Sequence, residues 1–143
     1  MLGRKDYTPD ELDHARSTIR VQLDAYKKLG ALATATDPVA EAALQEFEPI
    51  FFNNLTLVLD RFFVDRLRLV TGKDTNPLNE VEMMCDSLMN NDGMLRGNSV
   101  IAYLADLSVL RIKLGERIRI TEPDFERLSA AFFAEVEKRF VTA

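Results

Sequence analysis

The stretch IFFNNLTLVLDRFFVDRLRLV, residues 50–70, is the most apolar region of the chain. On a helix, its phenylalanine, leucine and valine side chains cover a broad face. A surface helix that touches only one neighbour needs a narrower apolar stripe than this. We therefore predict that residues 50–71 form a long central helix around which the other segments pack. Each phenylalanine or leucine that this helix buries should contribute roughly 1.5–3 kcal/mol.

The same stretch is too polar to cross a membrane, because charged side chains are costly in the hydrocarbon region. Seven of its 21 residues carry a side-chain amide or a charge: Asn53, Asn54, Asp60, Arg61, Asp65, Arg66 and Arg68. The first residues, 1–6, lack the apolar core of a signal peptide. A formal net charge of −5 disfavours general binding to nucleic acid or anionic membranes. The single cysteine, Cys85, fits a reducing compartment. We expect a cytoplasmic protein that binds neither nucleic acid nor membrane.

Two helix starts precede the central stretch. Thr8-Pro9-Asp10-Glu11 has the residues of a capping box, with proline at the first helical position. The apolar stripe that follows consists of Leu12, Ala15, Ile19, Leu23 and Tyr26. Gly30 should end this helix. Asp37-Pro38 should begin the second one, and Pro49 should kink or break it, because proline has no amide hydrogen to donate.

Two more helix starts follow the central stretch. Asn76-Pro77 predicts a third helix, which should stop at the turn-forming run Asn90–Gly93. Thr121-Glu122-Pro123-Asp124 predicts the last helix. Its apolar stripe consists of Phe125, Leu128, Phe132, Val136 and Phe140. For residues 94–108 a short helix and a strand are both open.

The period of the apolar residues changes to two in LRIKLGERIRI, residues 110–120. Leucine and isoleucine alternate there with arginine and lysine, as in a strand with one buried face. We predict a small β-hairpin over about 109–120. A loop of residues 115–117 or 113–117 keeps the apolar side chains on one face.

The polar face of this hairpin is the first candidate binding site, with four cations and one acid. With either loop, Arg119 lies opposite Lys113 or Arg111, and like charges directly opposite each other are destabilising. Glu135 and Glu137, a second copy of the chain, or an acidic ligand could offset this cost. The alternative is a solvated face whose cations discourage edge-to-edge aggregation.

A polar strip on the central helix is the second candidate. Asn54, Arg61 and Asp65 project from one side of the helix, and Arg61 and Asp65 are spaced to form an ion pair. The strip is either solvated or lines a polar pocket between helices.

The sequence contains partial matches to three kinds of functional site, and none of them is complete. Gly72-Lys73 resembles the end of a phosphate loop, but Leu67 and Asp74 occupy the positions that need glycine and serine or threonine. Gly72 instead marks the end of the central helix. His14 is the only histidine, so a di-iron site with two Glu-x-x-His pairs is excluded. Cys85 lies on an apolar face, where a thiol is inert. We assign no catalytic residue, metal or cofactor.

Three segments share an overall pattern with known proteins: NNLTLVLDRFFVDRLR (53–68), GKDTNPLNEVEMMCDSLMNNDG (72–93) and GERIRITEPDFERLSAAFFAEVEKRF (115–140). Over roughly residues 50–140 the chain resembles a group of small uncharacterised bacterial helical proteins. No activity is assigned to that group. The resemblance implies a self-contained bacterial domain and transfers no site residues.

The sequence thus predicts a mainly α fold: one helical bundle of four to five helices over residues 1–143, with a small β-hairpin before the last helix. We expect a non-catalytic interaction domain that forms homo-oligomers or binds another protein. The alternative is a small-molecule or anion-binding protein, with an enzymatic activity left open. The binding residues for that alternative are Asn54, Arg61, Asp65, Arg111, Lys113 and Arg119.

Overall fold

The computed structural model describes residues 3–141, apart from the side chains of 34–36. The fold is mainly helical, as predicted. Within the described residues the helices are α1 (Pro9–Thr36), α2 (Pro38–Arg61), α3 (Arg68–Thr71), α4 (Pro77–Asn90) and α5 (Glu122–Phe140). A 3-10 turn, Ala105–Leu107, lies between α4 and α5. No helix in residues 3–141 combines the length and the apolar character needed to cross a bilayer.

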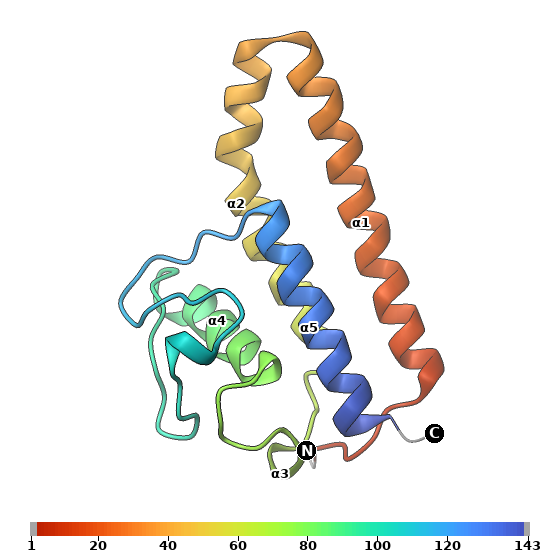
Figure 1. Cartoon of the computed structure of the whole chain (residues 1–143), viewed down its shortest axis with the longest axis vertical. Coiled ribbons are helices and arrows are strands. Elements are labelled where there is room, and N and C mark those ends of the chain that lie inside the picture. Colours follow the sequence, from red (N-terminus) through yellow and green to blue (C-terminus); the bar gives the residue numbers. More distant parts are fainter. Residues whose placement is uncertain (1–2, 142–143) are drawn as a thin grey trace.

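Helices α1 and α2 form a tall hairpin, and α5 packs against its lower half, with α4 on the other side of α5 from α1 (Figure 1). The core lies where these four helices meet. Its largest buried side chains include Phe52, Phe63, Phe125, Phe132 and Phe140. The upper part of the hairpin extends beyond α5 (Figure 1). Two ends of the molecule therefore differ: one is a packed four-helix core, and the other is a fork of two helices.

Helix α1 begins as predicted but ends later. The Thr8 hydroxyl accepts the Glu11 N–H at 3.1 Å, and the Glu11 carboxylate accepts the Thr8 N–H at 3.1 Å, which completes the capping box. The prediction that Gly30 ends the helix is wrong, because α1 continues to Thr36. A glycine inside a helix costs only about 1 kcal/mol relative to alanine, and the alanine-rich run ALATA follows it. The helix ends only at Asp37, whose carboxylate caps α2.

Helix α2 begins at Pro38 as predicted and runs through Pro49 without a break. A proline in a helix interior costs about 3 kcal/mol, because one backbone hydrogen bond is lost. Phe52, Leu55 and Leu59 are almost completely buried on the next turns. Burial of each such side chain contributes roughly 1.5–3 kcal/mol, which exceeds the cost of the proline.

The central helix ends earlier than the predicted residue 71, because α2 stops at Arg61 and the chain turns through residues 62–67 into α3. The N-terminal segment provides the reason. The Arg4 N–H donates to the Asp65 carbonyl at 2.6 Å, and the Leu67 N–H donates to the Arg4 carbonyl at 2.9 Å. These bonds occupy backbone groups that a longer helix would pair internally. A distant segment therefore decides where the helix stops.

The predicted β-hairpin over 109–120 is wrong, since the described chain forms no strand there. The backbone of this segment pairs with residues 93–95 instead. The Gly115 N–H donates to the Leu95 carbonyl at 2.7 Å, and the Leu95 N–H donates to the Glu116 carbonyl at 2.8 Å. The alternation in burial is largely kept without a hairpin: the cations are exposed, Ile118 and Ile120 are buried, and only Leu114, which is 54% exposed, breaks the pattern.

A buried carboxylate fixes the start of the same segment. Glu80 of α4 accepts the Val109 N–H at 2.7 Å and the Leu110 N–H at 3.0 Å. Arg111 follows with a φ of 56°, which is far from strand geometry. Residues 94–108 take neither predicted form and run as irregular chain around the 3-10 turn.

Candidate functional site

The residues of the predicted polar strip do not line one common pocket, because Asn54 and Arg61 border two different shallow grooves. Asn54 and Arg61 are exposed on α2, whereas Asp65 lies beyond the end of that helix. The predicted ion pair of Arg61 with Asp65 does not form, because the helix that would align them stops at Arg61. Asp60 and Arg66 form an ion pair instead, with 2.7 Å between Oδ1 and the guanidinium nitrogen.

The three cations proposed as an anion site do not share a face of a hairpin. Arg111, Lys113 and Arg119 are all exposed, and none of their side chains has a hydrogen bond or ion pair within residues 3–141. Glu135 and Glu137, one of the three offsets considered for these cations, form ion pairs with other arginines. These two carboxylates therefore do not provide the offset for the three cations, and the anion site stays a prediction.

The structure also places the residues that we rejected from the sequence as a phosphate loop, a reactive thiol or a di-iron ligand. Gly72 has a φ of 71° and ends α3, while Lys73 is exposed. Cys85 is buried, and burial raises the pKa of its thiol. His14 is exposed and its ring lies 5.9 Å from that of Phe62 in an edge contact. In the described part of the chain no group of three or more metal-binding side chains is close enough to hold an ion.

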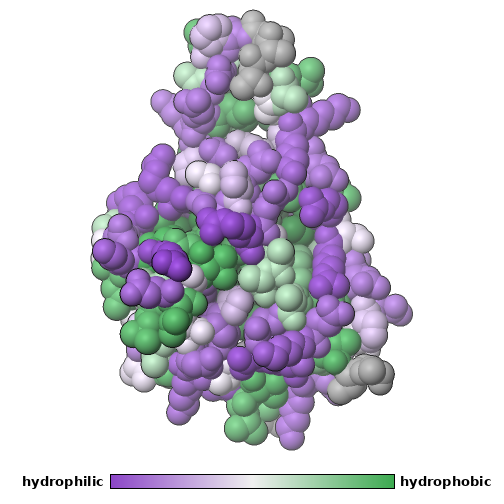
Figure 2. Space-filling view, in the orientation of Figure 1, coloured by the Kyte–Doolittle hydropathy of each residue, from purple (hydrophilic) through white to green (hydrophobic). Residues whose placement is uncertain are grey.

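The side of α2 that faces away from the core carries a regular row of mostly exposed residues. On the upper hairpin, hydrophobic side chains reach the surface among hydrophilic ones (Figure 2). On α2, a row at alternating steps of three and four lies away from the buried Phe52 and Leu59. The row consists of Phe47, Ile50, Asn54, Leu57 and Arg61, and is called the α2 seam below.

The α2 seam is open to solvent at four of its five positions, whereas Leu57 is partly buried against the core. Ile50 is 65% exposed and Phe47 is 43% exposed, which is unusual for large apolar side chains on a helix that also forms the core. Two shallow grooves meet at Leu57. One of 430 Å³ reaches from Phe47 past Leu57 to Leu88 of α4, and one of 370 Å³ continues to Phe62.

The spacing of the seam corresponds to the a and d positions of a heptad. Rows of this kind pair two helices, with side chains of one fitting between those of the other. Asn54 takes an a position in the middle, with Ile50 and Leu57 on either side. An asparagine at such a position specifies register and the number of helices, at a cost in stability. We predicted Asn54 and Arg61 as part of a polar strip, but we did not identify the apolar residues beside them as exposed.

No protein-family model, curated protein or solved structure matches the chain. The resemblance to small bacterial helical proteins therefore stays a prediction, and a function has to be argued from the geometry.

Proposed function

We propose that the protein is a non-catalytic helical interaction domain that pairs with a second copy of itself through the α2 seam. The observation that carries the proposal is an exposed heptad row, with apolar residues around a central asparagine, on the helix that also supplies the core. The proposal includes a cytoplasmic location, which the free and buried thiol of Cys85 supports.

Asn54 favours a second copy over an unrelated apolar helix. Its side-chain amide contains both a donor and an acceptor, so two copies of Asn54 facing each other satisfy one another. Facing a leucine or valine, the same amide would be buried without a partner, which costs about 1–3 kcal/mol. A parallel two-fold pair places each seam residue against its own copy. Ile50 and Leu57 then form the apolar layers above and below the asparagine pair.

The length of the seam sets the expected affinity. Its 15 residues, 47–61, span roughly 22 Å of helix. The two copies of Arg61 meet at the end of the row, where solvent screens their repulsion. Interfaces smaller than about 1,200 Å² in total are typical of weak complexes. We therefore expect a dimer in the micromolar range.

Sedimentation equilibrium of the full chain tests this proposal. The unmodified protein should approach twice its chain mass of 16.2 kDa as the concentration rises through tens of micromolar. Leu57→Glu should remain monomeric, because a carboxylate at a d position would be buried opposite its copy. Asn54→Leu should strengthen association and broaden the range of assembly sizes, since the residue that specifies two helices is lost.

Leu69→Glu is the matched control for Leu57→Glu. Leu69 is 82% exposed on α3, outside the seam, so the same substitution there should leave the dimer intact. A monomeric unmodified protein at 100 µM would contradict the proposal. The same conclusion would follow if Leu69→Glu dissociated the dimer as fully as Leu57→Glu does.

A further inference from the structure

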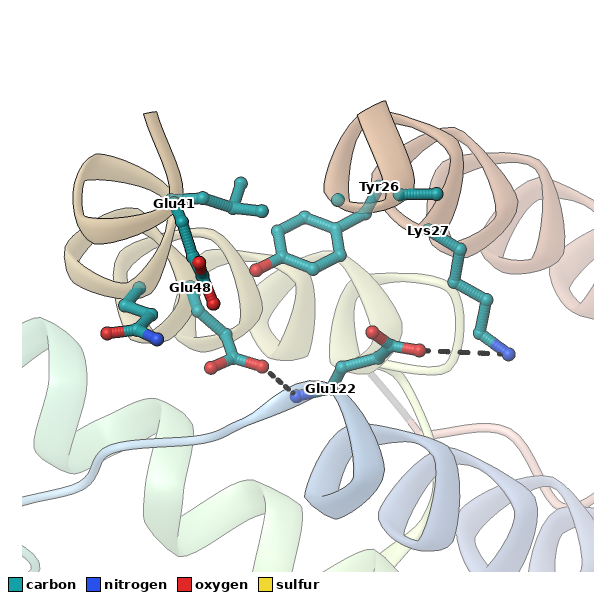
Figure 3. Close-up of a pocket in the computed structure, with 9 residues that line it drawn as sticks. Tyr26, Lys27, Glu41, Glu48 and Glu122 are labelled. Carbon is teal, nitrogen blue, oxygen red and sulfur yellow. Dashed lines mark hydrogen bonds and ion pairs between the residues drawn. The ribbon is translucent and has the colours of Figure 1, made fainter. Parts of the chain in front are cut away.

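A polar pocket lies at the fork of the α1–α2 hairpin, above the start of α5, and is separate from the α2 seam. Its volume is 350 Å³. Figure 3 shows Tyr26 and Lys27 entering from α1, Glu41 and Glu48 from α2, and Glu122 from the first turn of α5. The pocket therefore combines side chains from three helices at the point where the core ends.

Negative charge dominates this pocket, with three carboxylates and one ammonium group. Lys27 is already engaged, since its Nζ lies 2.5 Å from Glu126 and 3.8 Å from Glu122. Glu48 accepts the Glu122 N–H through one oxygen at 2.9 Å, which leaves its other oxygen available. Glu41 has no side-chain hydrogen bond or ion pair within residues 3–141. Two carboxylates thus remain uncompensated at one side of the pocket.

Tyr26 adds an unpartnered hydroxyl to the pocket. The residue as a whole is only 7% exposed, and its hydroxyl has no hydrogen-bond partner in the described part of the chain. The hydroxyl oxygen is open to the pocket and is not enclosed by protein. The ring is fixed between Phe51, stacked at 5.3 Å, and Phe52, in edge contact at 4.7 Å. In Figure 3 the hydroxyl points into the pocket, toward Glu41 and Glu48.

The protonation state of Tyr26 matches this arrangement. Burial, together with the charges of Glu48 and Glu122, raises the pKa of the phenol to about 12. The hydroxyl therefore stays neutral at physiological pH and adds no further negative charge. Its oxygen can accept a hydrogen bond from a cationic donor.

We propose that this pocket binds a primary ammonium group of a small aliphatic diamine. An ammonium group has three N–H donors, and the pocket presents three acceptors: the Tyr26 hydroxyl, Glu41 and Glu48. Charge-assisted hydrogen bonds of this kind are the strong ones. A diamine carries two positive charges, which balance the carboxylates that Lys27 leaves uncompensated. A divalent metal ion fits less well, because the described residues contain no metal-binding group of three side chains.

Isothermal titration calorimetry with 1,4-diaminobutane at low salt tests the proposal on the full chain. We expect saturable binding, and no binding of 1,4-butanediol, which has the same length but no charge. Tyr26→Phe removes only the unpartnered hydroxyl and should weaken binding about tenfold, as should Glu41→Gln. Both variants should fold normally, because neither group has a partner in the protein, and thermal unfolding checks this.

Glu46→Gln is the control for charge alone. Glu46 is exposed on the same helix and does not line the pocket, so this variant should bind the diamine within a factor of two of the unmodified protein. Absence of saturable binding at millimolar diamine would overturn the proposal. So would an equal loss in Glu46→Gln, or equally strong binding of Mg²⁺, since either would show that overall charge and not this pocket attracts the cation.

Discussion

Replacement of Arg66 by methionine should lower the free energy of unfolding by about 3–5 kcal/mol, because it leaves a buried carboxylate without its cation. The Arg66 side chain is only 4% exposed and that of Asp60 is 18% exposed. The guanidinium donates to Asp60 at 2.7 Å, to the Leu78 carbonyl at 3.1 Å and to the Phe63 carbonyl at 3.0 Å. One side chain thus joins the end of α2, the following turn and the start of α4.

Urea unfolding of two further variants distinguishes the contribution of the ion pair to stability from the effect of replacing any arginine by methionine. Arg119→Met changes an exposed arginine outside the α2 seam and should alter stability by no more than about 0.5 kcal/mol. Arg66→Met combined with Asp60→Asn should recover part of the loss, because no unpaired charge remains buried. A loss below about 1 kcal/mol in Arg66→Met would show that this ion pair does not hold the turn.

Glu80→Ala should lower the free energy of unfolding by about 2–4 kcal/mol. Glu80 is 2% exposed, and its two oxygens are the acceptors for the Val109 and Leu110 N–H groups. Without the carboxylate both N–H groups lose their partner, and each unsatisfied buried group costs about 1–3 kcal/mol. Glu80→Gln keeps one acceptor and similar volume, so its loss should be smaller.

The pH dependence of stability, compared between the unmodified protein and Glu80→Gln, is a second test of the role of Glu80. Burial raises the pKa of Glu80, although the N–H groups of Leu110 and Val109 oppose the shift. A carboxyl group with a raised pKa binds its proton more readily in the folded than in the unfolded state. The unmodified protein should therefore gain stability relative to Glu80→Gln as the pH falls from 7 toward 4.5. A gain in the opposite direction would mean that the two hydrogen bonds outweigh burial.

The helix starts were predictable from the sequence because their causes are local. At Thr8, Asn76 and Thr121, the capping side chain and its N–H partner lie within three residues of each other. A capping motif is therefore complete in the sequence, and these three starts are confirmed. The burial of Phe52, Leu55 and Phe63 was likewise predictable from composition, although Ile50 at the start of the same stretch is 65% exposed.

The errors occur where a distant residue decides the backbone. The end of α2 depends on Arg4, which is 61 positions away from Asp65. The course of 109–120 depends on Glu80 and Leu95, so alternation of apolar and charged residues did not predict a hairpin. These partners become neighbours only after folding, and a period of two contains no information about them.

The arrangement of the candidate site residues could not be predicted, for a related reason. Asn54 and Arg61 were correctly recognised as polar positions on a helix, but the side that faces the core depends on how α1, α4 and α5 pack. Tyr26 was predicted as part of an apolar stripe, and its ring is indeed buried. The position of its hydroxyl next to Glu41 and Glu48 arises from the fork between α1 and α2, which the predicted end of α1 at Gly30 would have removed.

Oxidative crosslinking of Asn54→Cys tests the self-association through the α2 seam most directly. A parallel pair places residue 54 against its own copy, so the new thiol should form an intermolecular disulfide rapidly at micromolar concentration. Cys85 is buried and should not take part. Leu69→Cys, an exposed position outside the seam, should crosslink slowly. Equal rates for both variants, or no disulfide in Asn54→Cys, would contradict the pairing of two copies through α2.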